Sequence, residues 1–195
     1  MDLKVVLLVV FFIITLTTGA KYELTVLDED VFSSCPDPAP GTLDVNGLFD
    51  LSELSTSMDA NGITVIGNST LIWDIKQEDR IQVNMQLLYL ERGTWTSTVF
   101  SITSRDFCKE MYDKNYFWYK YWTQYILNDT KDKCLNVPGT KMIHEPFLLS
   151  LTANVIGLRE GRYKANIMMR AYDSSGTERP TRICIEIQGD VFKMK

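Results

Sequence analysis

The sequence lacks the residue clusters from which metal sites are built. It has a single histidine, His144, and four cysteines without a C-x-x-C pair. Zinc sites usually combine several cysteine and histidine ligands at short spacing, so neither a metal nor another cofactor is predicted. Runs of basic residues are absent too, and 20 Lys and Arg stand against 25 Asp and Glu, for a net charge of −5. Such a chain is a poor match for nucleic acid or for an anionic membrane surface.

Signals of catalysis are also missing. A Ser-His-Asp arrangement would need His144, which lies in KMIHEPF, and no G-x-S-x-G elbow is present. The acidic runs at 28–30 and 78–79 lie in polar, turn-like segments and are interpreted as solvated. The DANG segment at 59–62 resembles only the start of a calcium loop, and we interpret it as a hairpin turn. No catalytic residue is predicted, and the protein is not expected to be an enzyme.

Only the N-terminus carries a long apolar run. Residues 1–20, MDLKVVLLVVFFIITLTTGA, place one lysine before the run and small residues after it, which is the layout of a secretory signal peptide. The run is short for a membrane span. We predict a signal peptide at 1–20 and a secreted, extracellular chain at 21–195 that forms a single domain without a transmembrane segment. Two N-x-[ST] sequons add predicted glycosylation sites at Asn68 and Asn128.

The cysteines predict two disulfides, because an even count in an oxidising compartment normally pairs. Four cysteines allow three pairings, and the sequence alone does not choose among them. Our hypothesis is the nested pairing, Cys35 with Cys184 and Cys108 with Cys134. It would tie the N-terminal segment to the last strand and close a smaller loop around an aromatic stretch.

Most of the chain follows the two-residue period of β-strands. RIQVNMQLLYL at 80–90 alternates apolar with polar side chains, as does TRICIEIQ at 181–188. Similar runs lie at 69–76, 94–102, 147–157 and 162–172. Turn signals separate these runs, at Asn61-Gly62, Arg92-Gly93, Glu160-Gly161 and Ser175-Gly176. The pattern predicts a mostly β protein, an antiparallel β-sandwich or β-cup with one helix or loop insertion.

Residues 104–127 form this insertion. Thr103 and Asp106 resemble a helix start, and large apolar side chains then recur at near-helical spacing. KNYFWYKYWTQYI, at 114–126, holds seven aromatic residues and is apolar nearly all round. A sheet covers only one side of such a helix. Another loop, a second molecule or a ligand must therefore cover the rest.

Two interpretations of the aromatic segment stay open at this point. It is either part of the core or a mobile flap over an apolar cavity, since ligand pockets are lined mainly by apolar and aromatic groups. The flap hypothesis predicts a set of cavity or lid residues: Trp73, Trp95, Phe117, Trp118, Trp122, Phe147 and Met168. A third interpretation is an extracellular adhesion or co-receptor module whose aromatic surface binds another protein.

The spacing of the cysteines and the C-terminal strands resembles that of the insect chemosensory B (CheB) proteins, relatives of the ganglioside GM2 activator and of the MD-2-related lipid-recognition proteins. The segments that carry the resemblance are VFSSCPDP, SRDFCKEMY, KDKCLNVPG, EGRYKANIMMRAYDSSG and TRICIEI. The resemblance implies a GM2-activator-like β-cup around a lipid-accommodating cavity, and it favours the nested disulfides.

The resemblance also implies a role in gustatory or contact detection of hydrophobic cues such as pheromones, with a membrane chemoreceptor as a possible partner. The GM2 activator lifts lipids from membranes and presents them to a hydrolase. This chain lacks the cysteines for the activator's additional disulfides. We therefore expect a simple secreted carrier of a hydrophobic small molecule or lipid, with a lipid-presenting activator as an alternative.

Overall fold

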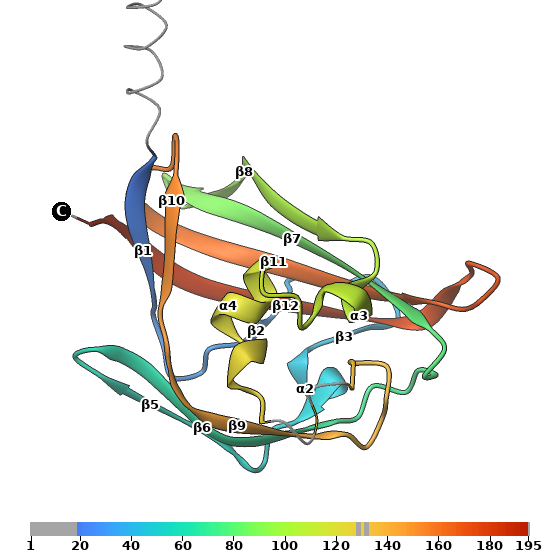
Figure 1. The fold of residues 1–195 in the computed structure, drawn as a ribbon. Helices are drawn as coiled ribbons and strands as arrows, with labels where there is room; N and C mark the ends of the chain where they lie inside the picture. The colour runs from blue at the N-terminus through green and yellow to red at the C-terminus, as the bar shows by residue number, and fades with distance from the viewer. Residues whose placement is uncertain (1–18, 128–129, 131–132, 195) are drawn as a thin grey trace, which may run out of the picture.

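The computed structural model describes residues 19–127, 130 and 133–194, which form two antiparallel β-sheets that face each other (Figure 1). The larger sheet has the strand order β10-β1-β12-β11-β7-β8. Two short strands, β2 and β3, also pair with β12, and β3 is the one that runs parallel to it. The strands are β1 (Ala20–Val26), β2 (Ser33–Ser34), β3 (Thr42–Leu43), β7 (Arg80–Glu91), β8 (Thr94–Ser104), β10 (Leu151–Val155), β11 (Gly161–Tyr172) and β12 (Glu178–Lys193).

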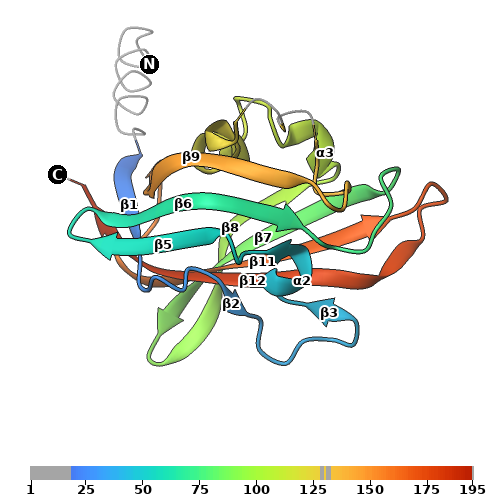
Figure 2. The same cartoon turned by 90° about the horizontal axis from the view of Figure 1, so that it is seen from below.

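The smaller sheet is built around β6, which pairs with β4 and β5 on one side and β9 on the other. Figure 2 shows β5, β6 and β9 lying across β11 and β12 of the larger sheet. One residue separates β9 from β10, so the chain passes directly from one sheet to the other. The elements are β4 (Phe49–Asp50), β5 (Leu54–Asp59), β6 (Gly62–Leu71), β9 (Lys141–Leu149) and the short helix α2 (Val45–Leu48). The prediction of a mostly β, antiparallel cup is confirmed.

The hairpins form where the sequence predicts tight turns. Arg92 and Gly93 join β7 to β8 with φ of 50° and 82°. Two positive φ values in a row are the mark of the turn type whose twist matches that of paired strands. Asp59 and Gly62 close the β5–β6 hairpin, and the Asp59 side chain accepts a hydrogen bond from the Asn61 amide at 2.7 Å. The DANG segment is therefore a turn, as predicted.

The main core lies between the two sheets. Period-two alternation points Ile81 and Val83 of β7, Ala171 of β11 and Ile183 of β12 at the smaller sheet, and all four are fully buried. Trp73, in the extended segment after β6, is 0 % exposed and donates its indole N–H to Thr181. A second, smaller cluster packs around Val26, Ile63, Val65 and Phe147.

The insertion is less helical than the spacing of its aromatic residues predicts. It contains three short pieces, α3 (Phe107–Glu110), α4 (Phe117–Tyr121) and the 3₁₀ turn η1 (Thr123–Tyr125). Asp113 interrupts the helix, because its carboxylate accepts hydrogen bonds from the backbone and side chain of Asn115. Such local bonds compete with helical ones. Asp106 occupies the N-cap position of α3 but makes no capping bond through its side chain.

The two disulfides join Cys35 to Cys184 and Cys108 to Cys134, which is the nested pairing. The predicted signal peptide, apart from its last two residues, lies outside the described residues, as does the predicted glycosylation site Asn128. Asn68 lies in β6, half-buried, and its side-chain amide donates to Glu53. None of the helices in the described part of the chain is long and apolar enough to cross a membrane.

A buried ion pair anchors β12 to the loop before β7, and its loss should be measurable. Arg179 donates two hydrogen bonds, of 2.8 and 2.7 Å, to the buried carboxylate of Asp79, so the interpretation of the acidic run at 78–79 as solvated is wrong for Asp79. These bonds hold the pKa of Asp79 below its ordinary value of 3.8. The pair therefore stabilises the fold above that value and loses its effect as the pH falls through the lowered pKa. We expect Arg179→Met to lower the free energy of unfolding by about 2–3 kcal/mol at pH 7.

Denaturant unfolding of wild type and Arg179→Met between pH 2 and pH 7 measures this effect. The difference between the two proteins should shrink as the pH falls below about 4, because protonation of Asp79 removes the ion pair from wild type as well. A difference that stays constant over this range would contradict the assignment.

Candidate ligand-binding site

The aromatic insertion lies between the two sheets on the side of β8 and β9 (Figure 1). Its first part follows β8, and α3 packs against β7 of the larger sheet. Its end reaches the smaller sheet, where Ile126 bridges to His144 and the Leu127 amide donates to the Ile143 carbonyl. The insertion thus spans the gap between the edges of both sheets.

The aromatic side chains of the insertion pack on one another and on the main core. The rings of Phe107 and Trp118 meet edge to face with centroids 5.3 Å apart. Trp122 stacks on Phe107 at 6.5 Å and meets Phe49 of the smaller sheet at 6.3 Å. Phe117 is half-buried and contacts Trp118. This cluster fills the space between the sheets next to the main core. The side chains that the flap interpretation assigns to a lid are therefore the same ones that pack as core in this structure.

Specific polar bonds hold the insertion in place. Tyr121 donates its hydroxyl to the Thr152 carbonyl of β10, and Thr123 donates to the Met111 carbonyl within the insertion. Trp122 donates its indole N–H to Nε2 of His144 at 3.3 Å. The Cys108–Cys134 disulfide ties the start of the insertion to the segment that follows it. The ring contacts described above are non-directional apolar packing, which a guest molecule could replace.

Beside the insertion, part of the inner face of the larger sheet remains half exposed. Ala165 of β11 pairs with Leu87 of β7 and with Ile187 of β12, so the three side chains share the face that points at the smaller sheet. All three are half-buried, as are Met85 and Ile167 in the next row. We call these five residues the apolar strip. Central strands of a sheet normally bury such side chains. The strip is therefore apolar surface that the fold leaves partly accessible for contact with another molecule.

The strip runs between the two hydrophobic clusters. Met85 and Ile167 pack against the main core, as do Phe117 and Trp122 of the insertion. Ile187 packs against the second cluster, together with Tyr125. The strip and the insertion therefore border the same region of the cup.

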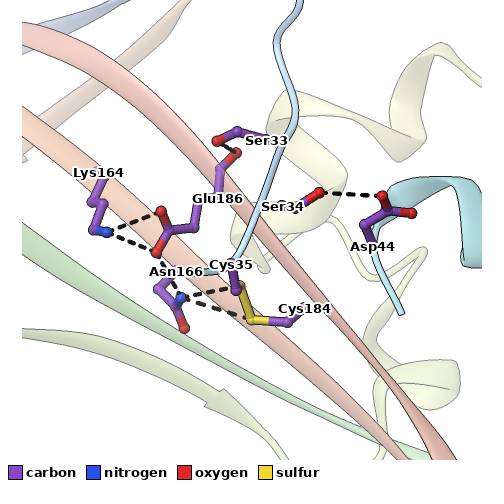
Figure 3. The surroundings of a disulfide bond; sticks show 8 residues. All are labelled: Ser33, Ser34, Cys35, Asp44, Lys164, Asn166, Cys184 and Glu186. Atoms are coloured by element: carbon purple, nitrogen blue, oxygen red, sulfur yellow. Dashed lines mark hydrogen bonds and ion pairs between the residues drawn. A yellow bond between two sulfur atoms is a disulfide. The ribbon is translucent and has the colours of Figure 1, made fainter. Parts of the chain in front are cut away.

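A small pocket lies elsewhere, beside the Cys35–Cys184 disulfide (Figure 3). Its volume is about 150 Å³, below the 300–1,000 Å³ usual for drug-sized ligands. It is lined by Ser34, Cys35, Pro38, Thr42, Leu43, Asp44 and Cys184. A long apolar ligand would have to use the space next to the strip instead, and would have to displace part of the insertion.

The structure brings together only part of the residue set predicted for the cavity or lid. Phe117, Trp118 and Trp122 gather in the insertion, and Trp73 lies in the adjoining main core. Phe147 belongs to the second cluster, where its ring stacks on Tyr125 at 4.4 Å.

Trp95 and Met168 lie on the opposite face of the larger sheet. Trp95 covers the amino group of Lys164 at 4.9 Å, and Met168 pairs with Cys184 of β12. The strip residues Leu87 and Ala165 were not predicted, and the register of β7 with β11 shows that they share a face.

His144 lies in the middle of β9, 7 % exposed, with its Nδ1 buried. Burial lowers the pKa of His144 below its ordinary value, and a backbone bond to Gly67 opposes this effect. The residue is therefore neutral at pH 7. Within the described part of the chain, no three His, Cys, Asp or Glu side chains gather in a way that could hold a metal ion.

Comparison with known proteins gives only remote similarity. No protein-family model matches the chain. No curated protein matches its sequence. Among solved structures, it is similar to chicken MD-1 complexed with lipid IVa, with 12 % identity over 89 % of this chain and 98 % of that chain, and a TM-score of 0.31. Because the two chains do not superpose closely, the proposals below rest on the contacts within this chain.

Proposed function

We propose that this protein carries a hydrophobic small molecule or lipid between the apolar strip and the aromatic insertion. The observation that carries the proposal is the half-exposed strip in the centre of the larger sheet, bordered by a cluster of aromatic rings. Ligand pockets for apolar molecules have this composition, with few polar groups to orient the ligand. In the absence of ligand the aromatic insertion occupies the space beside the strip, and the ligand displaces it on binding.

The energetics of this exchange are favourable for a long alkyl chain. Each buried methylene contributes about 0.8 kcal/mol, so a fatty chain contributes on the order of 10 kcal/mol before association losses. The ligand would replace ring contacts of Phe117 and Trp122 with its own. No charged recognition group is required, which agrees with the apolar strip.

The setting of this function follows from the sequence. The signal-peptide pattern and the disulfides support a secreted, extracellular protein, and the two sequons support glycosylation. The resemblance to insect CheB proteins supports a role in chemosensation, in which the carrier would deliver its ligand to a membrane chemoreceptor. The family membership and this role remain predictions.

Titration with a fluorescent fatty-acid probe, at pH 5.5 and at pH 7.5, tests the carrier function. We expect saturable binding by wild type. Ala165→Trp, which fills the strip, should weaken this binding at least about tenfold, since overfilling a packed site excludes a guest. Val99→Trp adds the same ring at a residue of β8 that is 90 % exposed and should leave binding unchanged.

Two results would contradict the proposal. One is the absence of probe binding by wild type at both pH values, together with the absence of lipid in solvent extracts of the secreted protein. The other is equal binding by wild type and a correctly folded Ala165→Trp variant.

A further inference from the structure

The insertion is fastened to the smaller sheet through the single histidine of the chain. Trp122, at the end of α4, donates its indole N–H to Nε2 of His144 in β9, over 3.3 Å. An indole nitrogen can only donate, so Nε2 must keep its lone pair and the imidazole proton must lie on Nδ1. The contact therefore exists only while His144 is neutral.

Protonation of His144 would reverse this contact. An imidazolium donates from both nitrogens, so Nε2–H would face the indole N–H without an acceptor between them. The charge would also be buried, since His144 is 7 % exposed and only a backbone bond to Gly67 favours the cation. A buried charge without an anionic partner is strongly unfavourable, and moving the insertion away would return the ring to water.

The surroundings of His144 offer the cation little compensation. β6, which pairs with β9 at this point, contains no charged residue, and its Gly67 contributes only a backbone bond. The Phe147 ring lies 6.3 Å away. The titratable side chains on the packed elements are Asp50 of β4, Tyr119, Lys120 and Tyr121 of α4, Tyr125 of η1, and Lys141 and Glu145 of β9. The charged ones among them are exposed.

We propose that the Trp122–His144 contact is an acid-sensitive latch, in which protonation of His144 releases the aromatic insertion and opens the apolar strip. The latch rests on the proposed carrier function in that the strip is the site it would open. Histidine is the side chain whose ordinary pKa lies between pH 5 and 8, and this chain has one.

The sign of the effect follows from the burial of the ring. Burial holds the pKa of His144 below 6.5 in the closed form, whereas the open form exposes it to water. The closed form is therefore fully stabilised above pH 6.5 and loses stability as the pH falls below that value. Between pH 7.5 and pH 5.5 the opening equilibrium can rise by up to about tenfold, the limit for one open-state group titrating near 6.5.

Hydrogen exchange of the backbone amides at 117–126 tests the latch without a ligand, after correction for intrinsic exchange rates. Wild type should show up to about a tenfold rise in opening between pH 7.5 and pH 5.5. His144→Gln is the matched control, because its amide oxygen can still accept from Trp122 but does not titrate, so its opening should stay nearly constant. Trp122→Phe, which removes the donor, should open more at pH 7.5 and respond less to acid.

The outcomes separate the latch from the carrier function. Equal pH dependence of exchange in wild type and His144→Gln overturns the latch, whatever the probe titration gives. Acid-induced opening of wild type alone supports the latch, even if a fatty-acid probe does not bind and the carrier proposal falls. If both hold, probe association should accelerate at pH 5.5 in wild type and not in His144→Gln.

Discussion

Replacing Lys164 with methionine is expected to lower the free energy of unfolding by about 3–5 kcal/mol, because it leaves a buried carboxylate without its partner. Lys164 lies on the outer face of the larger sheet, and its ammonium group is 2.8 Å from the Glu186 carboxylate (Figure 3). The two side chains are only 7 % and 5 % exposed. Asn166 donates a further hydrogen bond to Glu186, and the Trp95 ring covers the ammonium group.

The double variant Lys164→Met/Glu186→Met is the informative control. It removes both charges and keeps similar side-chain volume, and such replacements are often neutral or stabilising. We expect it to recover most of the stability lost in Lys164→Met, as measured by urea unfolding at pH 7. A double variant less stable than the single one would mean that the charges serve the fold through other contacts.

The second large effect is expected from the longer disulfide. Removing it with Cys35→Ser/Cys184→Ser frees a loop defined by a sequence separation of 149 residues, which the chain-entropy model values at about 5 kcal/mol. The Cys108–Cys134 pair spans 26 residues and should contribute about 3.5 kcal/mol. Guanidinium unfolding of the two double variants beside wild type, under non-reducing conditions, gives both values.

The two disulfides should also differ in what their loss affects. The longer one joins the segment before β3 to β12, far from the insertion, so its removal should leave insertion opening unchanged. The shorter one closes a loop that contains most of the insertion, and its removal should raise hydrogen exchange at 117–126. A larger stability loss for the shorter disulfide would contradict the loop-entropy argument.

Strand existence could be predicted from the sequence, because apolar alternation in β7 and β12 reflects a face buried against the other sheet. The turn at Arg92-Gly93 was equally predictable, since few residue pairs suit two positive φ values. The length of the helices in the insertion could not be predicted, because the Asp113–Asn115 bonds that interrupt the helix depend on local geometry. The aromatic spacing there reflects packing on the core rather than one continuous helix.

The site was harder to predict because both faces of the larger sheet carry apolar side chains. Trp95 looks like a cavity residue in sequence, yet it covers Lys164 on the outer face. Leu87 and Ala165 carry no distinctive signal, and their role depends on which strands become neighbours. His144 beside Glu145 and Pro146 looks in sequence like a loop or strand-end residue, yet it lies buried in mid-strand.

The near-continuous path of β9 and β10 has a consequence for how a guest would enter. The insertion meets this path at His144 in β9 and at Thr152 in β10, so one edge accepts the side-chain hydrogen bonds of Trp122, Tyr121 and Lys120. Breaking these side-chain hydrogen bonds leaves the pairing of β6 with β9 and of β1 with β10 intact. A ligand could therefore enter after the insertion detaches from the edge formed by β9 and β10, while the two sheets stay together. The energy barrier to entry would be set by the side-chain hydrogen bonds and by the backbone contacts of Ile126 and Leu127 with β9.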